Sequence, residues 1–316
     1  MNNFSVTLKE GQILNYKVYG NTNNRAVIFF HGFGSSASGL YINETDLDVK
    51  NLYIIAVNRP GYGYTSLKNY NMTSFSKDIK TLLEKLNLDK VDVIGWSAGG
   101  LYAQVFASMY PEYVKSLTLI GSAIPLKGKI TKNTLPFNWR FISFLNSYFP
   151  YMTKYYFKQL SKKINQSLQT VVKESIHKMP EADQEVANQK YFQEVIIEGT
   201  VEAYHNNGVA VYNDALAMTE KISISNDMRP YKVYIWHGEK DNIWPLQTAN
   251  VLNKLYTGSS VKIMKNQGHL LYLSHFDEIL NEIKKWPEPI VNECLVIQLM
   301  IRSMIVIKMD GLVKDS

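Results

Sequence analysis

Residues Val91–Gly100, which read Val-Asp-Val-Ile-Gly-Trp-Ser-Ala-Gly-Gly, decide the fold of this chain. The first four are mostly β-branched and predict a short buried strand. Residues 95–99 form the pattern G-x-S-x-G around Ser97, and an apolar helix is expected from Leu101 to Tyr110, before Pro111. Strand, tight turn and helix in this order are the context in which G-x-S-x-G presents a serine at the carboxyl edge of an α/β sheet.

The turn constrains the residues around Ser97. A serine at such a bend adopts a strained backbone conformation, and Gly95 and Gly99 remove the side chains that would collide there. The N–H of Ala98, in the first turn of the helix, has no acceptor within the helix and would face an anion formed at the serine. The alternative is an ordinary Gly-Ser turn without a chemical role.

Apolar runs on both sides of this stretch predict the other strands. These runs are Phe4–Leu8, Ile13–Tyr19, Arg25–Phe30, Leu52–Val57, Ser116–Ile120, Lys232–His237 and Val261–Met264. The first two alternate and indicate a hairpin, whereas continuous apolar runs are typical of parallel strands buried on both faces. Helices are expected at Ser74–Leu86, Pro245–Tyr256 and Ser274–Lys284. The predicted fold class is α/β, with a mostly parallel sheet of about eight strands and helices on both faces.

The alternation of strand and helix is interrupted once. Residues 122–226 are expected to form an inserted helical cap, residues 1–121 and 227–286 the core, and residues 287–316 a C-terminal tail of unknown role. Aromatic residues crowd the cap: Trp139, Phe141, Phe144, Tyr148, Phe149, Tyr151, Tyr155, Tyr156 and Phe157. They are expected either to form the core between the cap helices or, in part, to wall an apolar substrate pocket.

Charge is distributed unevenly along the chain. From Tyr113 to Lys173 there are nine Lys and one Arg but no Asp or Glu, so this segment carries +10. Since the whole chain carries +6, the remainder carries −4. The basic segment is either a solvated face or a surface that attracts an anionic membrane or an acidic substrate. It contains no nucleic-acid-binding motif, so no nucleic-acid partner is expected.

The composition is that of a soluble globular protein, with 46% hydrophobic and 20% charged residues. The single cysteine, Cys294, cannot form a disulfide within the chain and fits a reducing compartment. The first residues, Met1–Ser5, lack the basic and apolar regions of a secretory signal, and no run reaches the ~18 apolar residues of a spanning helix. A cytoplasmic location is therefore expected.

A serine hydroxyl is a weak nucleophile, so it needs a base, and the base needs a group that orients it. Among six histidines, His269 fits best because it follows the last strand in a turn that Gly268 can tighten. His275 is the rival, but it lies at the start of the final helix. His31 and His237 end strands and precede glycines, which favours structural roles.

The orienting acid is expected on a loop next to that of the base. Asp241 follows the strand that precedes the one leading to His269, and Glu239 is its local competitor. The loop after Ile120 is the other position for such an acid. The acid-free segment from Tyr113 to Lys173 excludes it, so Asp241 is the predicted acid.

Five motifs in this order resemble the α/β-hydrolase superfamily, in its capped branch of esterases, C–C hydrolases and related enzymes. They are His-Gly-Phe-Gly at 31–34, Asn-Arg-Pro-Gly-Tyr-Gly at 58–63, Gly-Trp-Ser-Ala-Gly-Gly at 95–100, His-Gly-Glu-Lys-Asp at 237–241 and Gly-His at 268–269. The order Ser97, Asp241, His269 is also that of the superfamily. The resemblance implies that the N–H groups of Phe33 and Ala98 form an oxyanion hole.

The resemblance implies acyl transfer to a serine, without a metal or organic cofactor. The expected function is hydrolysis of a small or medium apolar carboxylic ester, so the partner is a small-molecule acyl substrate. Two alternatives stay open. The same triad could cleave a C–C, amide or thioester bond or transfer an acyl group, and the fold could serve a ligand-binding receptor or signalling protein with little turnover. The sequence predicts neither the substrate nor the oligomeric state.

Overall fold

The computed structural model describes residues 2–127, 134–222, 224 and 229–285. The chain divides into two compact units, Met1–Glu278 and Ile279–Ser316. The sheet and all the residues predicted for the site belong to the first unit. The predicted tail at 287–316 lies outside the described residues.

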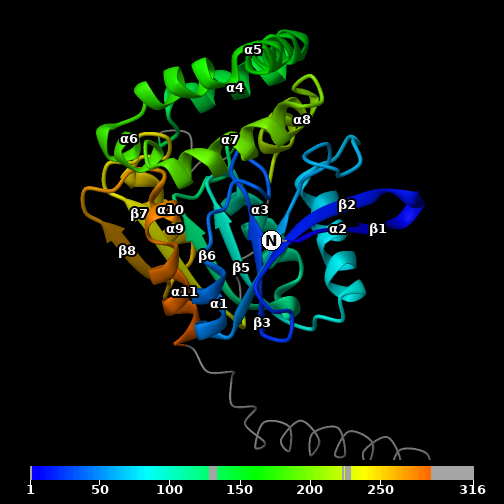
Figure 1. The fold of residues 1–316 in the computed structure, drawn as a ribbon, viewed down its shortest axis with the longest axis vertical. Coiled ribbons are helices and arrows are strands. Elements are labelled where there is room, and N and C mark those ends of the chain that lie inside the picture. Colours follow the sequence, from blue (N-terminus) through cyan, green and yellow to red (C-terminus); the bar gives the residue numbers. More distant parts are fainter. Residues whose placement is uncertain (1, 128–133, 223, 225–228, 286–316) are drawn as a thin grey trace, which may run out of the picture. The chain divides into compact units, whose positions relative to one another are not determined.

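An eight-stranded sheet forms the centre of the first unit (Figure 1), in the order β1-β2-β4-β3-β5-β6-β7-β8. The strands are β1 (Asn2–Thr7), β2 (Ile13–Tyr19), β3 (Arg25–Phe30), β4 (Leu52–Val57), β5 (Val91–Trp96), β6 (Val114–Ile120), β7 (Lys232–Gly238) and β8 (Ser260–Met264). β1 and β2 form the expected antiparallel hairpin, and β2 is also antiparallel to β4. All other neighbouring pairs are parallel, which confirms the predicted sheet.

Helices cover both faces of the sheet because successive strand residues point to opposite sides. They include α1 (Glu44–Lys50), α2 (Met72–Lys85), α3 (Ala98–Met109), α9 (Leu246–Leu255) and α10 (Leu271–Ser274). The last helix, α11 (Phe276–Lys284), begins in the first unit and continues into the second. On β3, the ring of Phe29 lies 6.0 Å from that of Phe276. The next ring, that of Phe30, lies 6.3 Å from Phe75 of α2 and 6.2 Å from Phe106 of α3. All five side chains are buried.

Three predicted helix starts are wrong by two residues or more. α3 begins at Ala98 rather than Leu101. α2 begins at Met72 rather than Ser74, because Asn71 is the N-cap and Ser74 completes a capping box with it. The last predicted helix is split, since α10 ends at Ser274 and α11 begins at Phe276. Boundaries depend on such local hydrogen bonds, which the apolar periodicity does not encode.

Among the described residues, five helices lie between β6 and β7, and we call them the helical insertion. They are α4 (Phe137–Tyr148), α5 (Pro150–His177), α6 (Glu181–Ala187), α7 (Lys190–Tyr204) and α8 (Val209–Met218). α5 is kinked at Ser167, whose φ of −151° and ψ of 54° are not helical. Figure 1 shows α7 and α8 close to the sheet, with α4 and α5 farther from it.

Candidate active site

Ser97 lies between the end of β5 and the start of α3, in the strained conformation expected of the turn. Its φ of 54° and ψ of −125° are unusual for a residue with a Cβ, and such strain costs about 1–3 kcal/mol. A Cβ on Gly99 would lie 2.0 Å from the carbonyl oxygen of Phe30, and one on Gly95 would lie 2.5 Å from that of Gly99. Both positions therefore require glycine.

Backbone hydrogen bonds hold Ser97 in this conformation. Its N–H donates to the carbonyl of Ile120 at 3.0 Å, and its own carbonyl accepts from Ala123 at 2.9 Å. The strained turn is thus tied to the end of the neighbouring strand β6. Ala98 is the first residue of α3, so its N–H has no acceptor within the helix.

The structure brings Asp241 and His269 together from the loops after β7 and β8. The Nδ1 of His269 lies 2.8 Å from Oδ2 of Asp241, and both residues are buried. The other oxygen, Oδ1, accepts the backbone N–H groups of Ile243 and Trp244, each at 2.9 Å. Because the carboxylate only accepts, we assign the imidazole proton to Nδ1, which leaves a lone pair on Nε2.

The electrostatic surroundings of His269 favour its protonated form. Burial lowers the pKa of His269, but the charge of Asp241, the hydrogen bond to it and a further contribution from Asp183 outweigh burial. The pKa of His269 is therefore raised above its ordinary value. Such a group is suited to receive a proton and to hold it during a reaction.

Gly121, directly after β6, provides the space for this pair. Its φ is +46°, and a Cβ there would lie 3.0 Å from Oδ2 of Asp241 and 3.2 Å from Nδ1 of His269. The sequence reasoning missed this residue. The feature that could have indicated it is a glycine at the carboxyl end of β6, the strand next to β5, which leads to Ser97.

Asp183 of α6 contacts the histidine loop from the helical insertion. Its Oδ2 accepts the backbone N–H of His269 at 3.0 Å, and its Oδ1 accepts that of Leu270 at 2.7 Å. Its side chain is buried, and burial raises its pKa despite these two hydrogen bonds. A Cβ on Gly268 would lie 2.3 Å from Oδ1 of Asp183, so this close approach requires glycine. No motif in the sequence indicates a role for Asp183.

A second buried carboxylate of the insertion, Asp214 of α8, contacts the core through Arg59. The two side chains form an ion pair of 2.7 Å with almost no exposure. Arg59 also donates to the carbonyls of His31 and Gly32, at 2.7 and 2.9 Å. Asp214 therefore supports, through Arg59, the loop that carries Phe33.

Three tyrosine hydroxyls complete the surroundings of Asp214. Tyr62 donates to its Oδ2 at 2.8 Å, and Tyr102 donates to its Oδ1 at 2.5 Å. Tyr70 donates to the same Oδ1 at 3.4 Å. A buried charge with this many partners links α8 to the loop between β4 and α2 and to α3.

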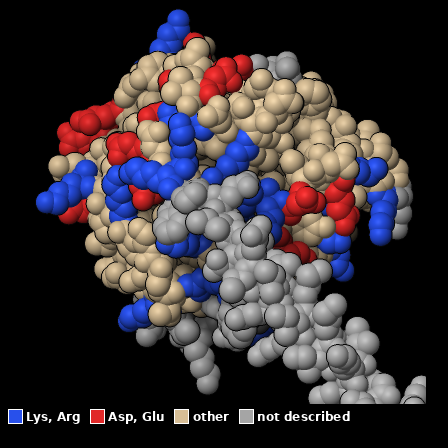
Figure 2. Space-filling model, turned by 90° about the horizontal axis from the view of Figure 1, so that it is seen from below, with Lys and Arg blue, Asp and Glu red and all other residues tan. Residues whose placement is uncertain are grey.

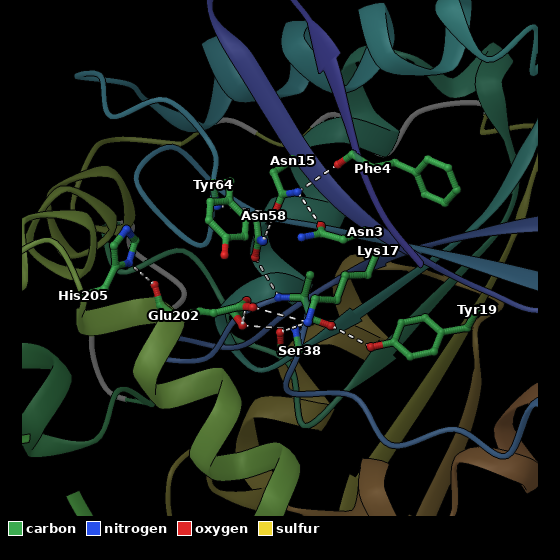
Figure 3. Close-up of polar contacts among 12 residues, drawn as sticks. Asn3, Phe4, Asn15, Lys17, Tyr19, Ser38, Asn58, Tyr64, Glu202 and His205 are labelled. Carbon is green, nitrogen blue, oxygen red and sulfur yellow. Dashed lines mark hydrogen bonds and ion pairs between the residues drawn. The ribbon is translucent and has the colours of Figure 1, made fainter. Parts of the chain in front are cut away.

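A third carboxylate, Glu202 of α7, contacts the loop after β3 (Figure 3). It accepts from Ser36 at 2.6 Å and forms an ion pair of 3.3 Å with Lys17 of β2. Lys17 in turn donates to Ser38. Three helices of the insertion thus each place one carboxylate on a different part of the core near the carboxyl ends of the strands.

The rival residues are engaged elsewhere. Glu239 accepts the backbone N–H of Asn266. The ring of His31 contacts the carbonyl of Gly32, and that of His237 contacts the carbonyl of Trp244. Burial lowers the pKa of both histidines. His275 is only partly exposed and lies 4.0 Å from Glu278.

Two absences hold for the described part of the chain. There, no group of three or more His, Cys, Asp and Glu side chains could hold a metal ion. None of the helices in the described ranges is long and apolar enough to cross a membrane.

Similar proteins were found by sequence. The chain is 26% identical to monoacylglycerol lipase ABHD6 of Rattus norvegicus over 260 residues, which cover 77% of this chain and 69% of the rat protein. It is 32% identical to the putative 2-succinyl-6-hydroxy-2,4-cyclohexadiene-1-carboxylate synthase of Bacillus subtilis over 132 residues. That match covers 40% of this chain and 47% of the bacterial protein.

A solved structure and a family model cover most of the chain. A thermophilic esterase from Thermogutta terrifontis superposes with a TM-score of 0.65 at 17% identity, covering 90% of this chain and 98% of the esterase. At that identity, the likeness shows the fold alone. The model of the alpha/beta hydrolase fold family matches residues 25–276. The chain therefore belongs to the alpha/beta hydrolase fold family.

Proposed function

We propose that this protein is a serine hydrolase that cleaves carboxylic esters with small or medium apolar acyl groups. One observation carries the proposal. Ser97 sits in a strained turn at the edge of the sheet where β7 and β8 also end, and the loops after these strands supply a buried Asp241–His269 pair. In a serine hydrolase, a serine is the nucleophile, a histidine is the base, and an aspartate is the acid that orients the base.

In the proposed reaction, Nε2 of His269 accepts the hydroxyl proton of Ser97 while Oγ attacks the ester carbonyl. The carbonyl π electrons move to oxygen, and the N–H groups of Phe33 and Ala98 hold the oxyanion. Collapse of this intermediate breaks the bond to the alcohol, which takes the proton from His269. Water, deprotonated by the same Nε2, then attacks the acyl-enzyme and releases the acid and free Ser97.

The contribution of each group to the rate of such a reaction is known in order of magnitude. Proton transfer by a positioned base contributes about 10²–10⁴ in rate, and each oxyanion donor about 10²–10³. Asp241 holds Nδ1 of His269 and stabilises the imidazolium that forms. Its second oxygen is fixed by two backbone N–H groups, so the carboxylate cannot turn away easily.

Aromatic packing next to Phe33 supports an apolar substrate. The ring of Phe33 lies 5.5 Å from Trp139 of α4 and 5.8 Å from Phe157 of α5. Trp139 in turn stacks on Trp244, with ring centroids 5.1 Å apart. These side chains join the insertion to the loop of the proposed oxyanion hole through apolar surface, which an acyl chain would favour over a charged group.

The relatives suggest which substrates to try. Matches to monoacylglycerol lipases favour monoacylglycerols as the first esters. The test begins with a fluorophosphonate probe, which labels only an activated serine. We expect labelling of the wild type and none of Ser97→Ala. Absence of labelling in the folded wild type would overturn the proposal of a serine hydrolase.

The substrate class needs a second measurement. Hydrolysis of p-nitrophenyl esters of increasing chain length and of monoacylglycerols should proceed in the wild type and stop in Ser97→Ala. Labelling without hydrolysis of any ester would contradict the ester proposal and favour cleavage of another bond. If the wild type showed neither labelling nor turnover but still bound a ligand, the receptor alternative would be favoured.

A further inference from the structure

Helix α4 has an aromatic stripe that points to solvent. Phe137, Phe141, Phe144 and Tyr148 follow one another at spacings of four, three and four residues, and so share one helix face. They are 69%, 49%, 50% and 69% exposed. The opposite side of the helix, with Trp139 and Asn146, is buried. Core packing therefore does not account for this stripe, contrary to the first of the two expectations for the aromatic residues.

The stripe continues into the first turns of α5. Nine of the twenty large apolar side chains that are exposed in the described part of the chain lie between residues 137 and 156. The other five are Phe149, Tyr151, Met152, Tyr155 and Tyr156. We call these nine residues the aromatic surface. A concentration of this kind on a monomeric protein marks an interaction site, since scattered exposed residues are the norm.

The charges around the aromatic surface have one sign. Arg140 and Lys154 are exposed within it, and Lys158 and Lys162 follow on α5 in a polar surface hollow with Asn207. Within the described residues, none of these four cations forms an ion pair. Residues 137–156 contain no Asp or Glu. The surface therefore offers positive charge that is not neutralised by neighbours.

This combination fits a lipid surface better than a protein surface. Tyr side chains prefer the boundary between headgroups and acyl chains, where the ring is apolar and the hydroxyl reaches water. Phe is common on the apolar face of helices that lie in this boundary. Amphipathic helices that lie on membranes join such an apolar face to Lys and Arg, which attract anionic lipids. We propose that α4 and the first turns of α5 dock on a bilayer that contains anionic lipid.

A second basic region provides a contrast. Figure 2, seen from below in relation to Figure 1, shows Lys and Arg gathered on the side away from the insertion. Lys90 immediately precedes β5, so it lies at the amino ends of the strands, and Lys254 lies on α9. Both side chains are exposed. Charge attraction alone would not distinguish these lysines from Arg140 and Lys154, whereas docking through the aromatic surface would.

The test is co-sedimentation of the full chain with phosphatidylcholine vesicles and with vesicles that also contain phosphatidylserine. We expect binding to the anionic vesicles that weakens as salt increases and is much weaker with phosphatidylcholine alone. Phe141→Gln/Tyr151→Gln should weaken binding about tenfold or more, since each ring contributes buried apolar area. Tyr64→Gln/Val201→Gln, which removes two exposed apolar residues elsewhere, should leave it unchanged.

Two double variants, each of which removes two positive charges, complete the experiment. Arg140→Gln/Lys154→Gln should weaken binding to anionic vesicles about tenfold, and Lys90→Gln/Lys254→Gln should not, although both pairs remove two positive charges. Equal, negligible binding of the wild type to both vesicle types would overturn the proposal. So would equal effects of the two charge pairs, or a wild-type dimer that Phe141→Gln/Tyr151→Gln converts to a monomer. Ser97→Ala should bind like the wild type, which separates this proposal from that of the reaction.

Discussion

The carboxylate of Asp183 accepts the backbone N–H of His269 at 3.0 Å, so the predicted catalytic base is held from two sides. Asp241 fixes the imidazole through Nδ1, and Asp183 fixes the backbone from which the imidazole extends. Asp183 comes from α6 of the helical insertion, whereas Asp241 comes from the loop after β7. The insertion therefore contributes to the position of the base as well as to the surface above the sheet.

We expect Asp183→Asn to lower kcat about tenfold, with little change in KM. An asparagine has the same shape but only one side-chain oxygen for the backbone N–H groups of His269 and Leu270. Its amide N–H₂ would face the second N–H, so one hydrogen bond is lost. The negative charge of Asp183 also raises the pKa of His269, so the acid limb of the kcat/KM profile should move to lower pH. Glu181→Gln, an exposed acid on the same helix, is the control and should change neither quantity. A loss of stability with an unchanged pH profile would contradict this positioning role.

Activity should depend on pH through His269. The base must be neutral to accept a proton, and its raised pKa places the acid limb of kcat/KM above the ordinary value of 6.5. Asp241→Asn removes the main group that raises this pKa, so its limb should lie at lower pH, and kcat should fall about 10³–10⁴-fold as orientation is lost. Stopped-flow or steady-state rates across the pH range measure both effects. An acid limb that stays in place in Asp241→Asn would argue against the pairing.

The same shift has a consequence for stability. A pKa that is higher in the folded than in the unfolded state means that the folded protein binds the proton more tightly. The stabilisation from His269 is therefore complete below about pH 6.5 and disappears as the pH rises through the folded pKa. Urea unfolding of the wild type and His269→Gln should differ more at about pH 5.5 than at about pH 8.5. The reverse order would show that the folded state disfavours the protonated imidazole.

Local patterns predicted most of the sheet, because the parallel strands β3 to β7 are almost wholly buried and appear as short apolar runs, whereas the edge strand β8 is largely exposed. β4 is an example: all six of its residues are buried, and its predicted and observed bounds agree. The strained turn around Ser97 was predictable for a similar reason, since its glycines and flanking elements are consecutive in the chain. His269 and Asp241 followed from their places after the last two strands.

Contacts across long sequence separations were beyond such reasoning. Asp183 meets a residue 86 positions later, and Asp214 meets Arg59 across 155 positions. Neither carboxylate stands in a pattern, and only the folded insertion brings it to its partner. The exposed aromatic residues of α4 were missed because helical spacing shows which residues share a face but not which face packs on the core. The cytoplasmic location, the roles of Phe33 and Ala98 and the domain limits stay predictions.

Gly121→Ala should reduce kcat at least tenfold without abolishing folding. Its added Cβ would meet both Oδ2 of Asp241 and Nδ1 of His269, so the pair must shift, and small misplacements of catalytic groups are costly. Gly258→Ala is the matched control because its φ of +79° is also positive but its Cβ would meet nothing within 4 Å. Both variants should lose about 1 kcal/mol of stability from the unfavourable φ. If both kept full activity, the contact at Gly121 would not matter for the reaction.

Asp214→Asn should be the most destabilising of these substitutions. It leaves the guanidinium of Arg59 buried without a counter-charge, which typically costs about 3–5 kcal/mol, although the asparagine oxygen can still accept from a tyrosine. Glu174→Gln is the control because it breaks an ion pair of similar length, 2.8 Å, whose two side chains are exposed, and such pairs contribute at most ~1 kcal/mol. Urea unfolding gives the two differences in the free energy of unfolding. Since Arg59 also binds the carbonyls of His31 and Gly32, we expect Asp214→Asn to lose activity at temperatures where it is still folded. Equal, small losses of stability in the two variants would mean that the buried pair is not what joins α8 to the core.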